Sequence, residues 1–135
     1  MKKLFILPLL ILAKVTFAQS DTSLVKFINP SSVSAPRGYS HAAVVDLGTC
    51  KMLILSGQVA LDNNGSLVGK DNFEMQAEQV FQNIKSIVET AGGKMDDVVK
   101  LGFFVRDVSQ LPTLRAVRDK FVNVKNPPAS TLVQV

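Results

Sequence analysis

The sequence predicts a single α+β domain in which both helices cover one face of a sheet. Three observations predict this class: a hairpin pattern at 42–61, a long amphipathic helix pattern at 73–91, and a strand, helix and strand pattern from 98 to the end of the chain. The chain has 135 residues, of which 47% are hydrophobic and 19% are charged, as expected of one packed globular domain. The predicted order of elements is β-β-α-β-α-β.

The hairpin is predicted from two apolar runs that flank a turn. Residues 42–47 are apolar and β-branched, the segment Gly48-Thr49-Cys50-Lys51 is typical of a turn, and residues 52–61 continue as the second strand. A second turn follows at 62–66, where Asn and Gly accept a positive φ. Before the hairpin, residues 19–38 are rich in Ser, Pro and Asn, and only a short strand at 24–28 is expected there.

The clearest element is the first helix. Its apolar residues recur at steps of three and four, which is the pattern of an amphipathic helix. They are Phe73, Ala77, Val80, Phe81, Ile84, Ile87, Val88 and Ala91. Asp71 and Glu74 predict a capping box at its start, and Gly92-Gly93 predicts its end.

The remaining elements follow the same logic. Residues 98–105 are apolar on both faces of a strand, which predicts a place inside the sheet. Residues 110–122 return to helical spacing, with Pro112 tolerated in the first turn and Pro127-Pro128 ending the helix. Residues 130–135 begin a last strand.

Residues 1–18 have the pattern of a secretory signal peptide. Two lysines precede an apolar run from Leu4 to Ala13, and Thr16-Phe17-Ala18 has small residues at both positions that a signal peptidase requires. The apolar run is shorter than the roughly 20 residues of a membrane-spanning helix. We expect cleavage after Ala18, a mature domain at 19–135, and a secreted or periplasmic protein with no membrane contact. The alternative is a buried N-terminal strand or helix.

The charge of the chain argues against a nucleic acid partner. The formal net charge is +4, but three of the 15 basic residues lie in the predicted leader, so 12 basic residues face 11 acidic ones in the rest. The basicity belongs largely to the leader, and no basic surface with interleaved aromatic residues is predicted.

Counting residues excludes several kinds of site. A single histidine, His41, and a single cysteine, Cys50, are too few for an ordinary zinc site, and one cysteine cannot form a disulfide within the chain. Neither Ser40 nor Ser56 has the context of a hydrolase nucleophile, so His41 is better interpreted as a half-buried polar residue than as a base. No glycine-rich phosphate loop is present. We therefore predict no metal and no cofactor.

The remaining motifs resemble one family. They are Pro36-Arg37-Gly38-Tyr39-Ser40-His41-Ala42, Leu55-Ser56-Gly57-Gln58-Val59, Gln76-Ala77-Glu78-Gln79 with Asn83-Ile84, Val98-Val99-Lys100-Leu101, Phe104-Val105-Arg106-Asp107, and Pro128-Ala129-Ser130-Thr131-Leu132-Val133-Gln134-Val135. In sequence and spacing they are similar to the RidA (YjgF) family of reactive-intermediate deaminases. The resemblance covers the chain from about Ile28 to Val135.

The resemblance implies a fold, an assembly and a chemistry. The fold is chorismate-mutase-like, the assembly is a homotrimer, and small-molecule pockets lie between the subunits. The reaction is the hydrolysis of unstable enamines or imines to 2-keto acids and ammonia, without metal or cofactor. In the matching positions, Tyr39 would wall the pocket, the backbone of Ser56 and Gly57 would bind the substrate, and Leu132 would border it.

Two positions depart from the family pattern. Deaminating members carry an arginine in the Pro-Ala-Arg-Ser segment, where it holds the substrate carboxylate, and Ser130 stands there in this chain. The family also continues beyond the position of Val135 through a strand with a water-positioning glutamate, so the resemblance implies a sheet without its final strand and a piece of a longer protein. Arg115 matches a pocket-lining position and could supply the cation, but the exposed side of an amphipathic helix explains it equally well.

Two functions follow. The first is a RidA-like trimer that hydrolyses a small imine or enamine. The alternative is a non-catalytic trimeric module that binds a small metabolite and has lost the deaminase anchor, which the serine at position 130 favours.

Overall fold

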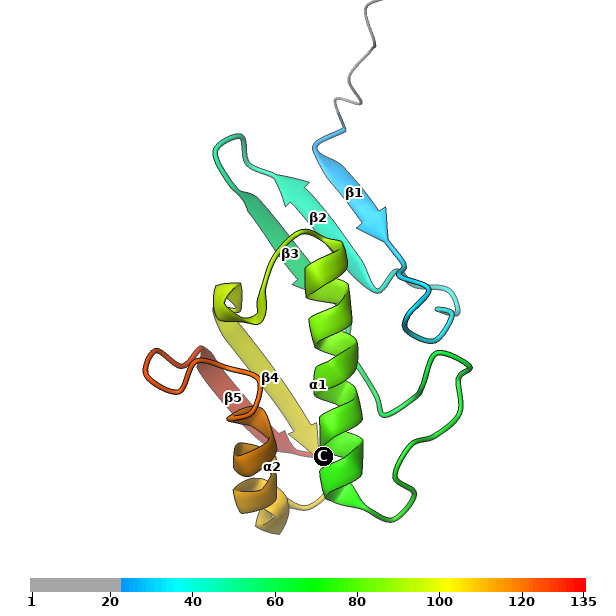
Figure 1. Cartoon of the computed structure of the whole chain (residues 1–135), viewed down its shortest axis with the longest axis vertical. Coiled ribbons are helices and arrows are strands. Elements are labelled where there is room, and N and C mark those ends of the chain that lie inside the picture. The colour runs from blue at the N-terminus through cyan, green and yellow to red at the C-terminus, as the bar shows by residue number, and fades with distance from the viewer. Residues whose placement is uncertain (1–22) are drawn as a thin grey trace, which may run out of the picture.

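The computed structural model describes residues 23–135, so the predicted signal peptide at 1–18 lies outside the described residues. Within them the α+β class is confirmed, with the strands in one layer and both helices on one side of it (Figure 1). The chain ends in a strand, as predicted.

The strands form two sheets rather than one. Strands β1 (Val25–Ile28), β2 (Ala42–Asp46) and β3 (Lys51–Leu55) are antiparallel, in the order β1-β2-β3. Strands β4 (Lys100–Val105) and β5 (Ala129–Gln134) form a parallel pair. No hydrogen bond of the described residues joins β3 to β4. The short strand expected at 24–28 is therefore part of a sheet, whereas the strand expected at 52–61 ends at Leu55.

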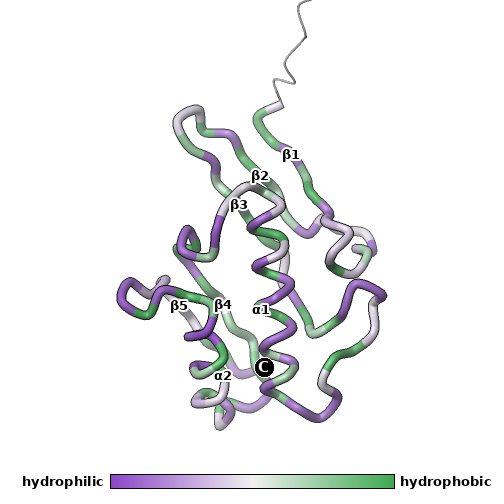
Figure 2. Tube along the Cα trace, in the orientation of Figure 1, coloured by the Kyte–Doolittle hydropathy of each residue, from purple (hydrophilic) through white to green (hydrophobic). Residues whose placement is uncertain are grey.

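Helix α1 (Phe73–Thr90) is as predicted, but its cap is not Asp71. The Asn72 side chain accepts a hydrogen bond from the Met75 amide at 3.0 Å, and Asp71 adopts a positive φ of 59° in the preceding turn. Asn is among the preferred N-cap residues because its side-chain oxygen satisfies an unpaired amide of the first turn. In Figure 2 apolar and polar stretches alternate along α1, as expected of a helix with one buried face.

Two short 3₁₀ helices flank β4. Helix η1 (Met95–Asp97) precedes this strand, and η2 (Val108–Gln110) follows it and leads into the second α-helix. Helix α2 (Leu111–Arg118) is shorter than the helix predicted at 110–122. Beyond Arg118 the Phe121 amide bonds to the Arg118 carbonyl, three residues back, so the chain tightens into a turn.

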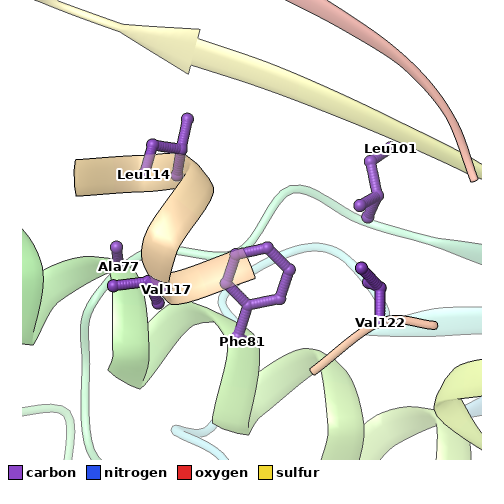
Figure 3. Packing of buried hydrophobic residues seen from close by; sticks show 6 residues of the cluster. All are labelled: Ala77, Phe81, Leu101, Leu114, Val117 and Val122. Carbon is purple, nitrogen blue, oxygen red and sulfur yellow. The ribbon is translucent and has the colours of Figure 1, made fainter. Parts of the chain in front are cut away.

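The core consists of two clusters, and α1 contributes to both. The larger cluster lies between α1, α2 and β4 (Figure 3). Its buried members are Ala77, Phe81, Leu101, Leu114, Val117 and Val122. The smaller cluster packs Ile87 of α1 against Val33 and Ala42, over the three-stranded sheet. Phe81 and Ile87 are 1% and 0% exposed, so α1 is the element that joins the two sheets.

The segment after β3 leaves the sheet and bonds to α1, and its only β pairing in the described residues is a bridge between Leu61 and Leu67. The buried Asn83 amide donates to the carbonyls of Val59 and Leu61 at 3.2 and 2.9 Å, and the Gln76 amide donates to the Gly69 carbonyl at 2.8 Å. Buried backbone groups require partners, and these side chains provide them. The predicted strand at 52–61 is therefore cut short because its second half is hydrogen-bonded to a helix.

The sheet face opposite the helices, called the outer face below, is apolar and uncovered within residues 23–135. The register of the strand pairs places the residues of the outer face on the side of the sheets away from the core clusters. Its exposed large residues are Val25, Phe27, Met52, Ile54, Phe104 and Val133. An apolar surface of this kind usually contacts a partner.

We predict that Asn83→Leu lowers the free energy of unfolding by about 1 to 3 kcal/mol, because the carbonyls of Val59 and Leu61 lose a buried donor. Gln82→Leu, on the exposed side of the same helix turn, is the control and should change stability by less than about 0.5 kcal/mol. Urea unfolding measures both. Equal stability of the two variants would contradict a role for Asn83 in holding this segment.

Candidate functional site

The six residues that the sequence analysis placed in a pocket fall into two groups. Arg115, Ser130 and Leu132 line a pocket between α2 and the β4–β5 pair, called the helix–strand pocket below. Tyr39, Ser56 and Gly57 lie near the ends of β2 and β3 and form the loop-end group. The sequence predicted the members of each group but not their separation.

The helix–strand pocket is a cavity of about 110 Å³. Its lining residues are Phe103, Leu111, Leu114, Arg115, Arg118, Ser130 and Leu132. The parallel register sets Ser130 opposite the buried Leu101 and sets Leu132 opposite Phe103, so both β5 residues face the helices. The pocket therefore has an apolar wall and a polar rim, which is the usual composition of a small-molecule site.

Two guanidinium groups border this pocket, and they differ in their partners. Arg118 is bound to the Asp119 carboxylate by Nε and Nη2 at 2.9 and 2.7 Å, so its charge is neutralised locally. Arg115 makes no ion pair and no side-chain hydrogen bond within residues 23–135, and its side chain is exposed. The spacing of three between Arg115 and Arg118 places both on one face of α2, which the sequence predicts to be exposed, so Arg118 was not predicted as a pocket residue.

Helix α2, which carries both arginines, is held at each end. At its approach, the Ser109 hydroxyl and amide bond to Asp107 and lower the pKa of that carboxyl, and the Gln134 side chain accepts from the Val108 amide at 3.0 Å. Past its other end, Lys120 pairs with Glu78 of α1 at 2.6 Å, and that carboxylate raises the pKa of Lys120. These bonds set the position of Arg115 over β5.

The loop-end group is built on backbone bonds between β2 and β3. The Ser56 amide donates to the His41 carbonyl at 2.9 Å, and the Ser56 hydroxyl donates to the Ser40 carbonyl at 2.6 Å. The Tyr39 ring stands edge-on to the His41 ring with centroids 5.5 Å apart and is 48% exposed. His41 is 1% exposed, so the prediction of a half-buried residue was wrong: the 29–40 segment and Gln58 cover it completely.

Gly57 is open on the surface. A Cβ atom there would meet no other atom within 4 Å, and its φ lies outside the left-handed region. The chain itself therefore gives no steric or conformational reason for glycine at this position. A glycine of this kind often marks a place where a ligand or another backbone approaches closely.

A second, more open cavity of about 260 Å³ adjoins the loop-end group. Its lining residues are Phe27, Ser40, Ala42, Ala43, Ile54, Leu55 and Ser56. Several of these belong to the outer face, whereas the helix–strand pocket lies on the helix side. The two cavities share no residue. In one copy of the described chain the predicted site is thus divided.

Between residues 23 and 135 no group of three or more His, Cys, Asp or Glu side chains is arranged to hold a metal ion. None of the helices in that range has both the length and the apolarity needed for a membrane crossing.

Comparison with known proteins gives consistent matches. The family model described as Endoribonuclease L-PSP matches residues 30–135. The chain is 33% identical to protein HMF1 of Saccharomyces cerevisiae over 109 residues, 81% of each chain. It is 40% identical to the 2-iminobutanoate/2-iminopropanoate deaminase of Salmonella typhimurium over 93 residues, 67% of this chain and 70% of that one.

The structural comparison agrees. The crystal structure of RidA from a Psychrobacter species matches with a TM-score of 0.71 and 36% identity, over 82% of this chain and 85% of that chain. This likeness confirms the fold that the motifs implied.

We predict that Gly57→Ala leaves the free energy of unfolding within about 0.5 kcal/mol of the wild-type value, because the position has room for a methyl group and an ordinary φ. The matched control is Gly69→Ala, where φ is 66° and the added Cβ would lie 2.6 Å from the Met75 Cβ, so a clear loss of stability is expected. Urea unfolding compares the two. A strong loss in the Gly57 variant would show that the chain itself requires this glycine.

Proposed function

We propose that this chain, which belongs to the Endoribonuclease L-PSP family and hence to the RidA (YjgF) family, hydrolyses a small imine or enamine acid to a 2-keto acid and ammonia. Relatives named 2-iminobutanoate/2-iminopropanoate deaminase support the reaction class. The single observation that carries the proposal is the helix–strand pocket, where an unpaired Arg115 lies at the rim beside Ser130.

The reaction needs an anchor and a positioned water rather than a nucleophilic side chain. Water adds its oxygen to the carbon of the C=N bond while the nitrogen takes up a proton, and the C–N bond of the resulting carbinolamine then breaks to release ammonia and leave the keto group. Holding the substrate against the water lowers the entropic part of the barrier. A guanidinium binds the substrate carboxylate through a charged hydrogen bond.

In this chain Arg115 takes the place of the arginine that Ser130 replaces. Both residues line one pocket, so a carboxylate bound there can meet the guanidinium from α2 and the hydroxyl from β5. Arg118 is committed to Asp119 and leaves Arg115 as the free cation of the pocket in the described residues. The backbone at Ser56-Gly57 and the Tyr39 ring then enclose the other end of the substrate.

The division of the site supports a homo-oligomer, and the family resemblance specifies a trimer. Because the loop-end group adjoins the outer face, packing copies on that face would place each loop-end group beside a neighbouring copy. The apolar outer face supplies the contact area. Active sites would then lie between subunits.

A non-catalytic binding module is the second candidate, and Ser130 favours it. A serine hydroxyl offers one neutral hydrogen bond where an arginine offers a bidentate charged one. Such a module would bind a small carboxylate in the same pocket without releasing ammonia.

We further propose that the protein is exported. The pattern at 1–18 supports removal of a signal peptide and a mature domain at 19–135. The domain would then act on small metabolites outside the cytoplasm, either in the periplasm or in the medium.

We predict release of a 2-keto acid from freshly generated 2-aminoacrylate, with Arg115 as the carboxylate anchor. A charged hydrogen bond contributes about 1.5 to 3 kcal/mol, which corresponds to a rate difference of about 10- to 100-fold, so Ser130→Arg, which adds a second cation to the pocket, should raise the rate by up to that factor. Arg115→Ala should lower the rate by a similar factor, and Arg106→Ala, on an exposed arginine outside the pocket, should not.

Keto acid formation is measured against the spontaneous hydrolysis. Binding of a carboxylate without keto acid release would favour the binding module. A fast wild type that neither Ser130→Arg nor Arg115→Ala alters would contradict the role given to Arg115.

We predict that Ile54→Lys converts the oligomer to a monomer, because a charge in the middle of the outer face must be desolvated when two copies meet. Val124→Lys is the control, since Val124 is also exposed but lies in the loop before β5, outside both sheets. Light scattering at micromolar concentration should give a trimer mass for the wild type and for Val124→Lys. A wild-type monomer would refute the assembly, and a trimer of the Ile54 variant would place the interface elsewhere.

A further inference from the structure

We propose that His41 is a positioning residue, which sets the Ser56-Gly57 backbone through the Gln58 side chain. The inference rests on the proposed function, because it assigns that backbone a part in substrate alignment. The His41 imidazole is buried, and the proposed reaction gives it no role.

The hydrogen bonds determine the tautomer of His41. Its Nε2 lies 2.7 Å from the Ser34 carbonyl oxygen, which can only accept, so Nε2 carries a proton. Its Nδ1 lies 3.5 Å from the Gln58 amide nitrogen. That nitrogen is a donor, so Nδ1 presents its lone pair to Gln58.

The Gln58 amide is oriented from both sides. Its nitrogen also donates to the Ser56 carbonyl at 3.0 Å, so one NH₂ group serves the imidazole and the backbone together. Rotating the amide by half a turn would place its oxygen against the Ser56 carbonyl oxygen and against the lone pair of Nδ1. The Nδ1 lone pair of His41 and the Ser56 carbonyl therefore favour the same amide orientation, in which Gln58 holds the peptide group between Ser56 and Gly57.

His41 also contacts the other parts of the loop-end group, through its backbone and through its ring. The His41 carbonyl accepts from the Ser56 amide, and the ring is in edge contact with Tyr39. The carbonyl of the Ser56–Gly57 peptide therefore accepts a hydrogen bond from the Gln58 side chain, and the Ser56 amide donates one to the His41 carbonyl. Gly57 itself stays exposed beside this fixed peptide.

A purely structural histidine would only tie the 29–40 segment to the sheet. Such a residue would act through the Ser34 bond and would be independent of Gln58. A positioning residue acts through Gln58, so replacing either partner should give the same effect, and replacing both should add nothing.

The test uses the full-length chain, four single variants and the double variant of His41→Leu with Gln58→Leu. His41→Leu and Gln58→Leu remove the contact, and His41→Asn restores an acceptor near the place of Nδ1 without the bond to Ser34. Gln82→Leu is the exposed control on α1. With 2-aminoacrylate-derived imine as substrate, we expect His41→Leu and Gln58→Leu each to lower kcat about tenfold and leave KM within about twofold, because they misalign the substrate without touching its anchor.

We expect the double variant to match the single ones and His41→Asn to recover most of the loss. Additive effects, or an Asn variant no better than the Leu variant, would overturn the proposal. If His41→Leu does not fold, Gln58→Leu alone decides, since an unchanged kcat would refute the positioning role.

The amide resonance of Gly57 separates this inference from the proposed function. It should shift in His41→Leu, return toward the wild-type position in His41→Asn, and stay unchanged in Gln82→Leu. If the wild type releases no keto acid, the proposed deaminase activity fails, and the Gly57 shifts still decide on His41. Unchanged shifts would overturn the positioning role.

Discussion

The burial of Phe81 and Ile87 on one helix is the interaction on which the rest of this structure depends. The two sheets share no hydrogen bond in the described residues, so backbone pairing cannot set their relative position. Phe81 packs against β4 and α2, and Ile87 packs over the three-stranded sheet. Since the loop-end group belongs to one sheet and the helix–strand pocket to the other, the geometry of any site that uses both depends on α1.

Helix α1 also stabilises the fold through polar side chains. Buried side-chain nitrogen and oxygen atoms in the described chain all have partners, and Asn83 is a clear case, because its amide donates to two carbonyls of the segment after β3. Burying an amide is costly unless it is bonded, so this arrangement specifies one position for the segment after β3. The exposed Gly57 lies at the beginning of that segment.

The sequence predicted the elements that follow from periodicity and missed those that depend on tertiary bonds. Helix α1 was found because its apolar side repeats regularly, and β4 because it is apolar on both faces. The early end of β3 could not be predicted, since residues 56–61 have the composition of a strand, whereas in the structure carbonyls of this segment bond to side chains of α1. The motifs named six site residues, but the separation of the loop-end group from the helix–strand pocket depends on how the sheets are placed, and no local pattern records that. Arg118 could have been found from its spacing to Arg115.

The two sheets also differ in the number of residues that separate their paired strands along the chain, and this difference predicts the order in which the sheets form. Strands β2 and β3 are joined by a short turn, so their register of Asp46 with Lys51 forms between near neighbours in the chain. Strands β4 and β5 pair Lys100 with Ala129, across η2, α2 and a loop. Closing longer loops costs more entropy before any contact is gained, and non-local pairing is correspondingly slow. We therefore expect the antiparallel sheet to form while the last third of this sequence is still unstructured, and the parallel pair to form later, once β5 has been synthesised.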